Sequence, residues 1–148
     1  GYDFSPDPHV TGINTSMAHY EDLDLDQGTS AKWQIQCLGP NGEIRDLSNY
    51  RARGSIKKSH ETSDSYALDF LVNIDAPPTD GIVTFSLNAS QTSQLTSRRY
   101  VYDVEMEIQE DSDITVERIL EGKVLVSRSV TNRVYYADSD ISSGQTRW

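Results

Sequence analysis

The feature that most constrains the fold is an alternation of apolar and polar residues with a period of two. It is clearest in RYVYDVEMEIQ, residues 99–109, where every second residue from Tyr100 to Ile108 is apolar and the residues between them are mainly acidic. Side chains of a β-strand point alternately to the two faces of its sheet, so this pattern predicts a strand with one buried face. Helical periodicity is nearly absent, and the chain therefore predicts an all-β fold.

The same alternation recurs along the chain in segments separated by turn residues. The further candidate strands are residues 20–26, 30–38, 50–58, 68–75, 81–88, 114–122 and 123–131. Asn41-Gly42 predicts a tight turn because glycine and asparagine adopt positive φ angles, and residues 88–98 predict a single helical turn with a serine N-cap. About seven to nine strands at this spacing are typical of a β-sandwich.

The two ends of the chain differ from this central domain, which spans residues 20–131. Residues 1–19 and 132–148 have no sustained period, and we expect both to be extended arms. Apolar and aromatic anchors are spread along them, whereas disordered tails usually lack such residues. We predict that these anchors bind neighbouring subunits. They are Tyr2, Phe4, Val10, Ile13, Met17, Tyr135, Tyr136 and Trp148.

The charge of the chain narrows the classes of partner. The formal net charge is −10, which argues against non-specific binding to nucleic acid, because phosphate affinity comes mainly from clustered Lys and Arg. No Lys or Arg precedes Lys32, so the N-terminal arm forms an acidic strip suited to a basic partner. No stretch approaches the roughly 18 consecutive apolar residues of a membrane span, and we expect no membrane partner.

The stretch DLDLDQG, residues 22–28, has two interpretations. A calcium loop of the EF-hand type needs glycine at position 6 and glutamate at position 12, and these positions hold Gln27 and Trp33. A strand explains the same residues by alternation, with Leu23 and Leu25 inward and the acids outward. The strand is favoured, and we predict no metal site.

No catalytic or cofactor site is predicted either. His9, His19 and His60 lie in or beside polar segments without a nucleophile motif, and no phosphate-binding loop or metalloprotease motif is present. Cys37 is the single cysteine, so no disulfide can form within the chain, and its place on an alternating segment predicts a buried thiol. We therefore expect no enzyme activity.

The order of several segments resembles a family of small tail-associated structural proteins of bacteriophages. The resemblance covers about residues 23–132 and depends on the succession of motifs, each of which is weak alone. The segments are DLDLDQGTSAKWQIQCLGPNGEIRDLSNYRARGSIKK, GIVTFSLNASQTSQL, RRYVYDVEMEI and RILEGKVLVSRSVT. The two arms depart from the short form of the family.

The resemblance implies an immunoglobulin-like β-sandwich that serves as a non-enzymatic virion component. It further implies a tail, baseplate or neck location, other virion proteins as partners, repeated copies in a symmetric assembly, and assembly in the cytoplasm of a bacterial host. Gln27-Gly28-Thr29, Asp46-Leu47-Ser48, Tyr100 and Tyr102 look like structural positions of the family. Two alternatives stay open: a capsid decoration protein, and a receptor- or glycan-binding module of a tail fibre.

Overall fold

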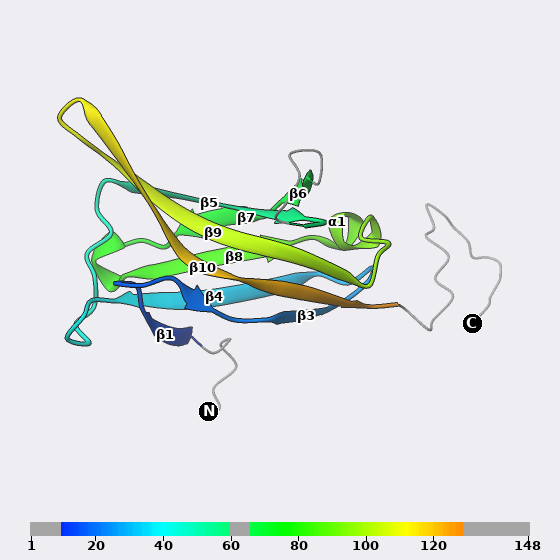
Figure 1. Cartoon of the computed structure of the whole chain (residues 1–148). Coiled ribbons are helices and arrows are strands. Elements are labelled where there is room, and N and C mark those ends of the chain that lie inside the picture. Colours follow the sequence, from blue (N-terminus) through cyan, green and yellow to red (C-terminus); the bar gives the residue numbers. More distant parts are fainter. Residues whose placement is uncertain (1–9, 60–65, 129–148) are drawn as a thin grey trace.

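Two β-sheets packed face to face form the fold in a computed structural model, which describes residues 10–59 and 66–128 (Figure 1). The strands are β1 (Val10–Asn14), β2 (His19–Tyr20), β3 (Leu23–Asp26), β4 (Ala31–Leu38), β5 (Tyr50–Lys57), β6 (Tyr66–Asp69), β7 (Leu71–Ile74), β8 (Ile82–Leu87), β9 (Arg99–Glu110) and β10 (Asp113–Ser127). One helical turn, α1 (Ala89–Ser93), and a 3-10 turn, η2 (Pro78–Asp80), complete the described elements. The predicted all-β sandwich is confirmed.

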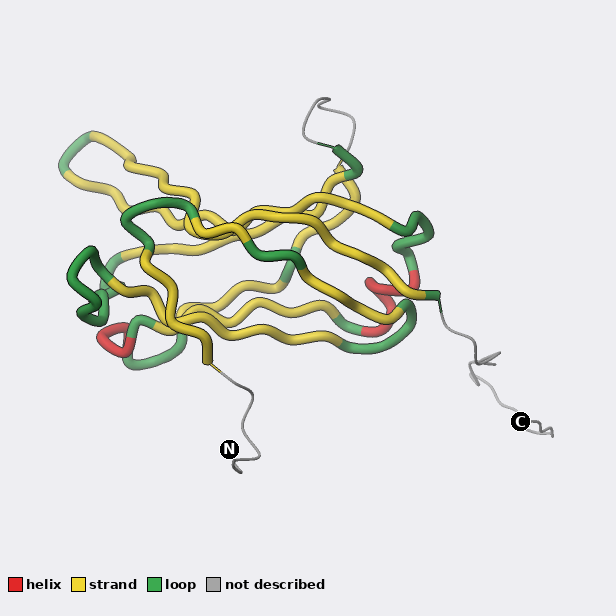
Figure 2. Tube along the Cα trace, turned by 60° about the horizontal axis from the view of Figure 1, so that its bottom comes forward, coloured by secondary structure: helices red, strands yellow, loops and turns green. Residues whose placement is uncertain are grey.

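Both sheets are mixed, that is, each contains parallel and antiparallel pairs, and Figure 2 shows their strands in yellow. The four-stranded sheet has the order β1-β4-β8-β7, and the six-stranded sheet has the order β2-β10-β9-β5-β6, with β3 also paired to β10. Most pairs are antiparallel, but β1 runs parallel to β4, and both β2 and β3 run parallel to β10. The segment before β4 therefore supplies an edge to each sheet.

The predicted strand over residues 68–75 divides at Phe70. Its first part, β6, pairs with β5 in the six-stranded sheet, and its second part, β7, pairs with β8 in the other sheet. The backbone N–H of Phe70 donates to the carbonyl of Gly54 at 3.0 Å, which holds the crossing point. Alternation continues through the crossing because the core lies between the sheets, so both halves turn their apolar side toward it.

Two predicted strands, residues 114–122 and 123–131, are instead one strand, β10, as far as Ser127. A β-bulge between Arg118 and Leu120 shifts the register against β9 and allows Ile119 and Leu120, which are adjacent, both to be buried. Gly122 lies in the middle of β10. A Cβ atom there would lie 2.1 Å from the carbonyl oxygen of Glu21, so glycine permits a close approach of backbones in place of the predicted break.

The core is formed by the inward-facing residues of both sheets, and its centre is aromatic. Phe85 is completely buried, stacks on Trp33 with ring centroids 5.3 Å apart, and meets Phe70 edge-to-face at 5.2 Å. Such pairs contribute about 0.5–1.5 kcal/mol beyond the burial of their area. Tyr102 closes the cluster at 6.0 Å from Phe70, and burial raises the pKa of its hydroxyl. That hydroxyl donates to the carbonyl of Glu21 at 2.6 Å.

The predicted helical turn is present as α1, but its N-cap is Asn88 and not a serine. The Asn88 side chain accepts from the Gln91 N–H at 2.8 Å, and the Gln91 side chain accepts from the Asn88 N–H at 2.9 Å. This capping box satisfies two backbone donors that the start of a helix leaves open. Thr92, buried in the same turn, donates to the Thr29 carbonyl at 2.8 Å and so attaches α1 to the turn after β3.

Candidate interaction surface

The described part of the N-terminal stretch is built into the sandwich edge. Ile13 points inward from β1 and is 3 % exposed, whereas Val10 on the same strand is 41 % exposed and Met17, in the turn before β2, is 75 % exposed. Two of these predicted anchors thus face solvent, and one belongs to the core. The other predicted anchors lie outside the described residues: Tyr2, Phe4, Tyr135, Tyr136 and Trp148.

The acidic stretch that follows has the predicted strand geometry. Leu23 and Leu25 are buried, and Asp24 and Asp26 are exposed. Asp22 lies between β2 and β3, and its carboxylate accepts from the Lys123 N–H at 3.0 Å, opposite the close approach at Gly122. In residues 10–59 and 66–128, no group of three or more His, Cys, Asp or Glu side chains is placed to hold a metal ion.

Arg45 joins three parts of the chain beneath the β9–β10 hairpin. Its guanidinium donates to both carboxylate oxygens of Glu117 on β10, each at 3.0 Å, to the Thr15 hydroxyl at 2.8 Å and to the Tyr50 hydroxyl at 3.1 Å. The hydrogen bond to Glu117 raises the pKa of Arg45 further above its usual range. Thr15 is itself bound to the carbonyl of Leu38. This Arg45 cluster therefore holds the N-terminal segment to the base of the hairpin.

We predict that Arg45→Met lowers the free energy of unfolding by about 2 kcal/mol. The value is below the roughly 3–5 kcal/mol of a fully buried pair, because the side chains of Arg45 and Glu117 are 19 % and 32 % exposed. Urea denaturation gives the measurement. Arg51→Met is the matched control, since Arg51 is 75 % exposed where it pairs with Glu107, and its loss is expected to be below about 0.5 kcal/mol. Equal losses in the two variants would contradict the proposed role of Arg45.

A groove of about 480 Å³ runs along the open side of the sandwich, between the β1/β4 edge of one sheet and the β2/β3 edge of the other. Its apolar lining includes Ile13, Leu23 and Phe85, and its polar lining includes Glu21 and Lys32. The groove thus combines apolar and charged lining residues, a mixture that is common in ligand-binding sites.

The thiol of Cys37 is not activated as a nucleophile. Cys37 is completely buried in the predicted strand position, and burial raises the pKa of its thiol to about 11. A thiol at such a pKa stays protonated at neutral pH and is a poor nucleophile. His19 lies 3.3 Å from Glu21 at the surface.

No helix in the described chain is long and apolar enough to cross a membrane.

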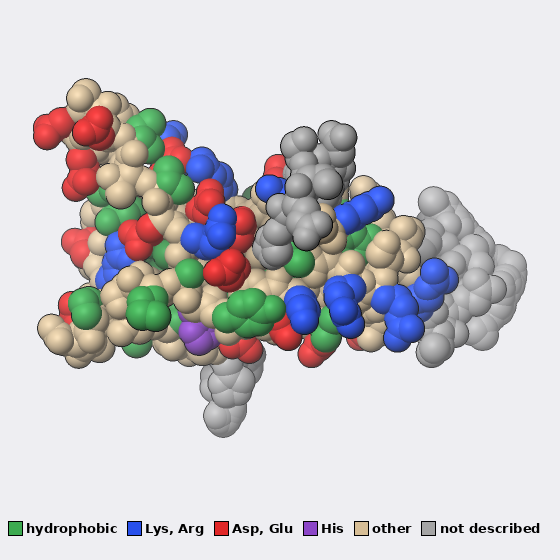
Figure 3. Space-filling view, viewed as in Figure 1, with side chains coloured by type: hydrophobic (Ala, Val, Ile, Leu, Met, Phe, Trp, Pro, Cys, Tyr) green, Lys and Arg blue, Asp and Glu red, His purple; other side chains and the backbone are tan. Residues whose placement is uncertain are grey.

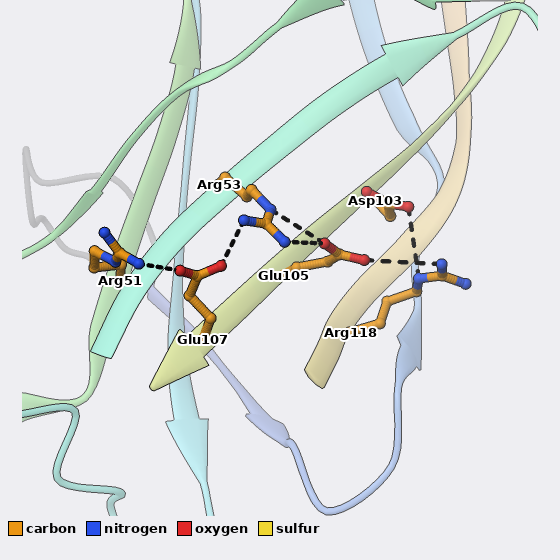
Figure 4. Close-up of polar contacts among 6 residues, drawn as sticks. All are labelled: Arg51, Arg53, Asp103, Glu105, Glu107 and Arg118. Carbon is orange, nitrogen blue, oxygen red and sulfur yellow. Dashed lines mark hydrogen bonds and ion pairs between the residues drawn. The ribbon is translucent and has the colours of Figure 1, made fainter. Parts of the chain in front are cut away.

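The outer face of the six-stranded sheet is strongly charged (Figure 3). In the middle of this face, Arg51 and Arg53 on β5 pair with Glu105 and Glu107 on β9, and Arg118 on β10 continues the series (Figure 4). We call these five residues, with Asp103, the charge ladder. Burial and then Glu105 raise the pKa of Asp103, and Arg118 lies 3.5 Å from it. The sequence predicts that the five members on β5 and β9 point outward but leaves their pairing open.

Apolar side chains are also exposed around the rim of the sandwich. Tyr20 is 59 % exposed on β2, Leu71 is 71 % exposed on β7, and Ile114 and Val116 are 56 % and 46 % exposed on the projecting hairpin. β1, β2 and β7 are edge strands of their sheets, and edge strands offer unpaired backbone groups to another chain. The described sandwich thus has edge strands and exposed apolar side chains that another chain could contact.

Comparison with known proteins adds a fold relationship. No protein-family model matches the chain, and no curated protein matches it. Among solved structures, it is similar to the N-terminal domain of phage TP901-1 ORF48, with a TM-score of 0.52 and 13 % sequence identity. The match covers 80 % of this chain and 96 % of that domain. The likeness shows that the two proteins share a fold.

Proposed function

We propose that the protein is a non-enzymatic structural component of a bacteriophage virion, located in the tail, baseplate or neck. The observation that carries this proposal is the shared fold, which extends over almost the whole of a phage domain. The order of sequence motifs points to the same class of protein independently. We also propose that the sandwich is immunoglobulin-like.

The sheet edges support a role in packing against other virion proteins. β1 ends the four-stranded sheet on one side, and Val10 at its start is exposed at this edge. An extended arm that adds a strand to the sheet of a neighbour gains main-chain hydrogen bonds, while side-chain pockets set its register. Asp3 and Asp7 in this arm favour a basic groove on that neighbour.

Cryo-electron microscopy of the intact particle tests the location. The expected result is density for the sandwich in the tail, baseplate or neck. Density confined to the capsid shell would refute the proposal in favour of a decoration protein. Retention of the isolated protein on host surface sugars, with no density except at a fibre tip, would favour a receptor- or glycan-binding module.

Deletion of residues 1–9 should reduce incorporation into particles about a hundredfold. That factor corresponds to about 1.5 kcal/mol for each of Tyr2 and Phe4, which under this proposal are buried against a neighbouring subunit. The thermal midpoint should change by less than about 3 °C, because the deletion leaves β1 and Ile13 in place. A loss of about 1 kcal/mol in the free energy of unfolding would already lower the midpoint by several degrees. Quantitative immunoblotting of purified particles measures the incorporation. Normal incorporation of the truncated protein would contradict the anchoring role of the arm.

A further inference from the structure

The two ends of the β9–β10 ribbon carry opposite charge. At one end the hairpin projects beyond the sandwich, and its tip bears Glu110, Asp111 and Asp113, all exposed (Figures 1 and 3). In the described chain none of these three carboxylates forms an ion pair with another residue. We call Glu110, Asp111, Asp113, Ile114 and Val116 the acidic tip.

At the other end of the same sheet, cations gather in spite of the net charge of −10. Strand register places Lys57 and Lys123 on either side of Val101, and Arg99 beside Leu125. Lys58, Arg98 and Arg128 adjoin these positions at the ends of the strands, and all six cations are exposed. We call the six cations, with Val101 and Leu125, the basic end.

None of the six cations of the basic end has an ion-pair partner within 4 Å among the residues that the structure describes. The charge ladder is the contrast, because its arginines are paired on the same face. A cluster of unpaired like charges repels itself, and an acidic partner relieves that repulsion.

The two ends cannot neutralise each other within one molecule. Asp113 and Lys123 are ten residues apart on β10, or roughly 33 Å at about 3.3 Å per residue. The Debye length is about 10 Å at 0.1 M salt, so this separation screens their attraction almost completely. Only a second molecule can bring the charges into contact.

We propose that the acidic tip of one copy binds the basic end of a second copy. The match is apolar as well as electrostatic. Ile114 and Val116 lie on the outer face of the hairpin, since Val116 is opposite Glu107 of the charge ladder, and acids flank them. On the basic end, the half-buried Val101 lies between Lys57 and Lys123, and the half-buried Leu125 lies between Arg99 and Asp24 of β3. The contact joins two different surfaces, so it can repeat from copy to copy.

Charge reversal in the full chain tests this contact without reference to the virion. One variant reverses the basic end (Arg99→Glu with Lys123→Glu), and the other reverses the acidic tip (Glu110→Lys with Asp113→Lys). Sedimentation velocity at about 50 mM salt should show concentration-dependent association of the unaltered protein. Each variant alone should associate about a hundredfold more weakly, because like charges then face each other. An equimolar mixture of the two variants should associate again, since both of its contacts pair opposite charges.

The mixture controls for net charge, because both of its members remain altered. Asp80→Lys is a further control that reverses an exposed charge outside both surfaces and should associate like the unaltered protein. Lys57→Glu with Arg128→Glu repeats the test on the basic end through different positions, and circular dichroism checks that each variant is folded.

Three results would overturn the proposal. The first is that the unaltered protein sediments as a monomer at low salt, at every concentration up to the millimolar range. The mixture of variants could fail to associate. A short DNA or RNA duplex could bind the basic end more tightly than a second copy does at the same salt, which would assign this end to nucleic acid.

Discussion

Replacement of Phe85 by alanine is expected to lower the free energy of unfolding by about 4 kcal/mol. Phe85 is fully buried and touches Trp33 and Phe70, one ring stacked and one edge-to-face. Truncation removes this burial and leaves a cavity between the two sheets, for which about 3–5 kcal/mol is typical. Urea denaturation at constant m-value measures the loss, and a native stability of 5–15 kcal/mol makes it a large fraction of the whole.

Leu71→Ala is the control for this prediction. Leu71 is apolar too, but it is 71 % exposed at the edge of the four-stranded sheet, so its truncation should change the stability by less than about 0.5 kcal/mol. A loss below about 2 kcal/mol for Phe85→Ala would show that the neighbouring rings close the space. The aromatic cluster would then be less tightly constrained than its geometry indicates.

Gly122→Ala is expected to lower the stability by about 3 kcal/mol, although it adds only one methyl group. The new Cβ would lie 2.1 Å from the carbonyl oxygen and 2.8 Å from the carbonyl carbon of Glu21. Both neighbours are backbone atoms that cannot rotate away, so the cost lies at the upper end of the range of about 1–3 kcal/mol for overpacking. Relief requires residues 19–22 to move away from β10.

Hydrogen exchange distinguishes this mechanism from a general loss of stability. The Glu21 N–H donates to the Glu121 carbonyl at 2.9 Å, and it should lose protection in Gly122→Ala before the amides of β9 do. Lys123→Ala, one residue further along, is the control, because its side chain is exposed and its backbone hydrogen bond to Asp22 is retained. Full protection of Glu21 with a loss below about 1 kcal/mol would contradict the close approach.

Much of the fold is predictable because burial between two sheets gives every strand the same period. The inward residues of β3, β4 and β9 all follow from alternation alone. The crossing at Phe70 is not predictable in this way, since a strand that changes sheets keeps its apolar side toward the shared core. Gly122 misleads for a related reason. A glycine in a strand pattern signals either a turn or a close backbone approach, and only the position of the distant Glu21 decides between them.

The candidate interaction surfaces are less predictable than the fold. Alternation shows that Arg51 and Glu107 point outward, but their pairing depends on the register between β5 and β9. The basic end is assembled from three strands, and its members are separated by as many as about 70 positions in the sequence, where acidic residues outnumber them. Ile13 is a different case. Its segment looks irregular in the sequence and predicts an arm, but it forms the edge strand β1, and Ile13 therefore belongs to the core.

The parallel attachment of β2 and β3 to β10 has a consequence for the order of folding. Asp22 and Lys123, which meet at this attachment, are 101 positions apart, so the contact closes a very long loop. Contacts between such distant positions form slowly, because the chain loses conformational entropy before the contact contributes any favourable free energy. During synthesis β10 also leaves the ribosome after every other strand of the sandwich. β2 and β3 are therefore made early but fixed late, and until then residues 19–26 remain free to pair with another molecule.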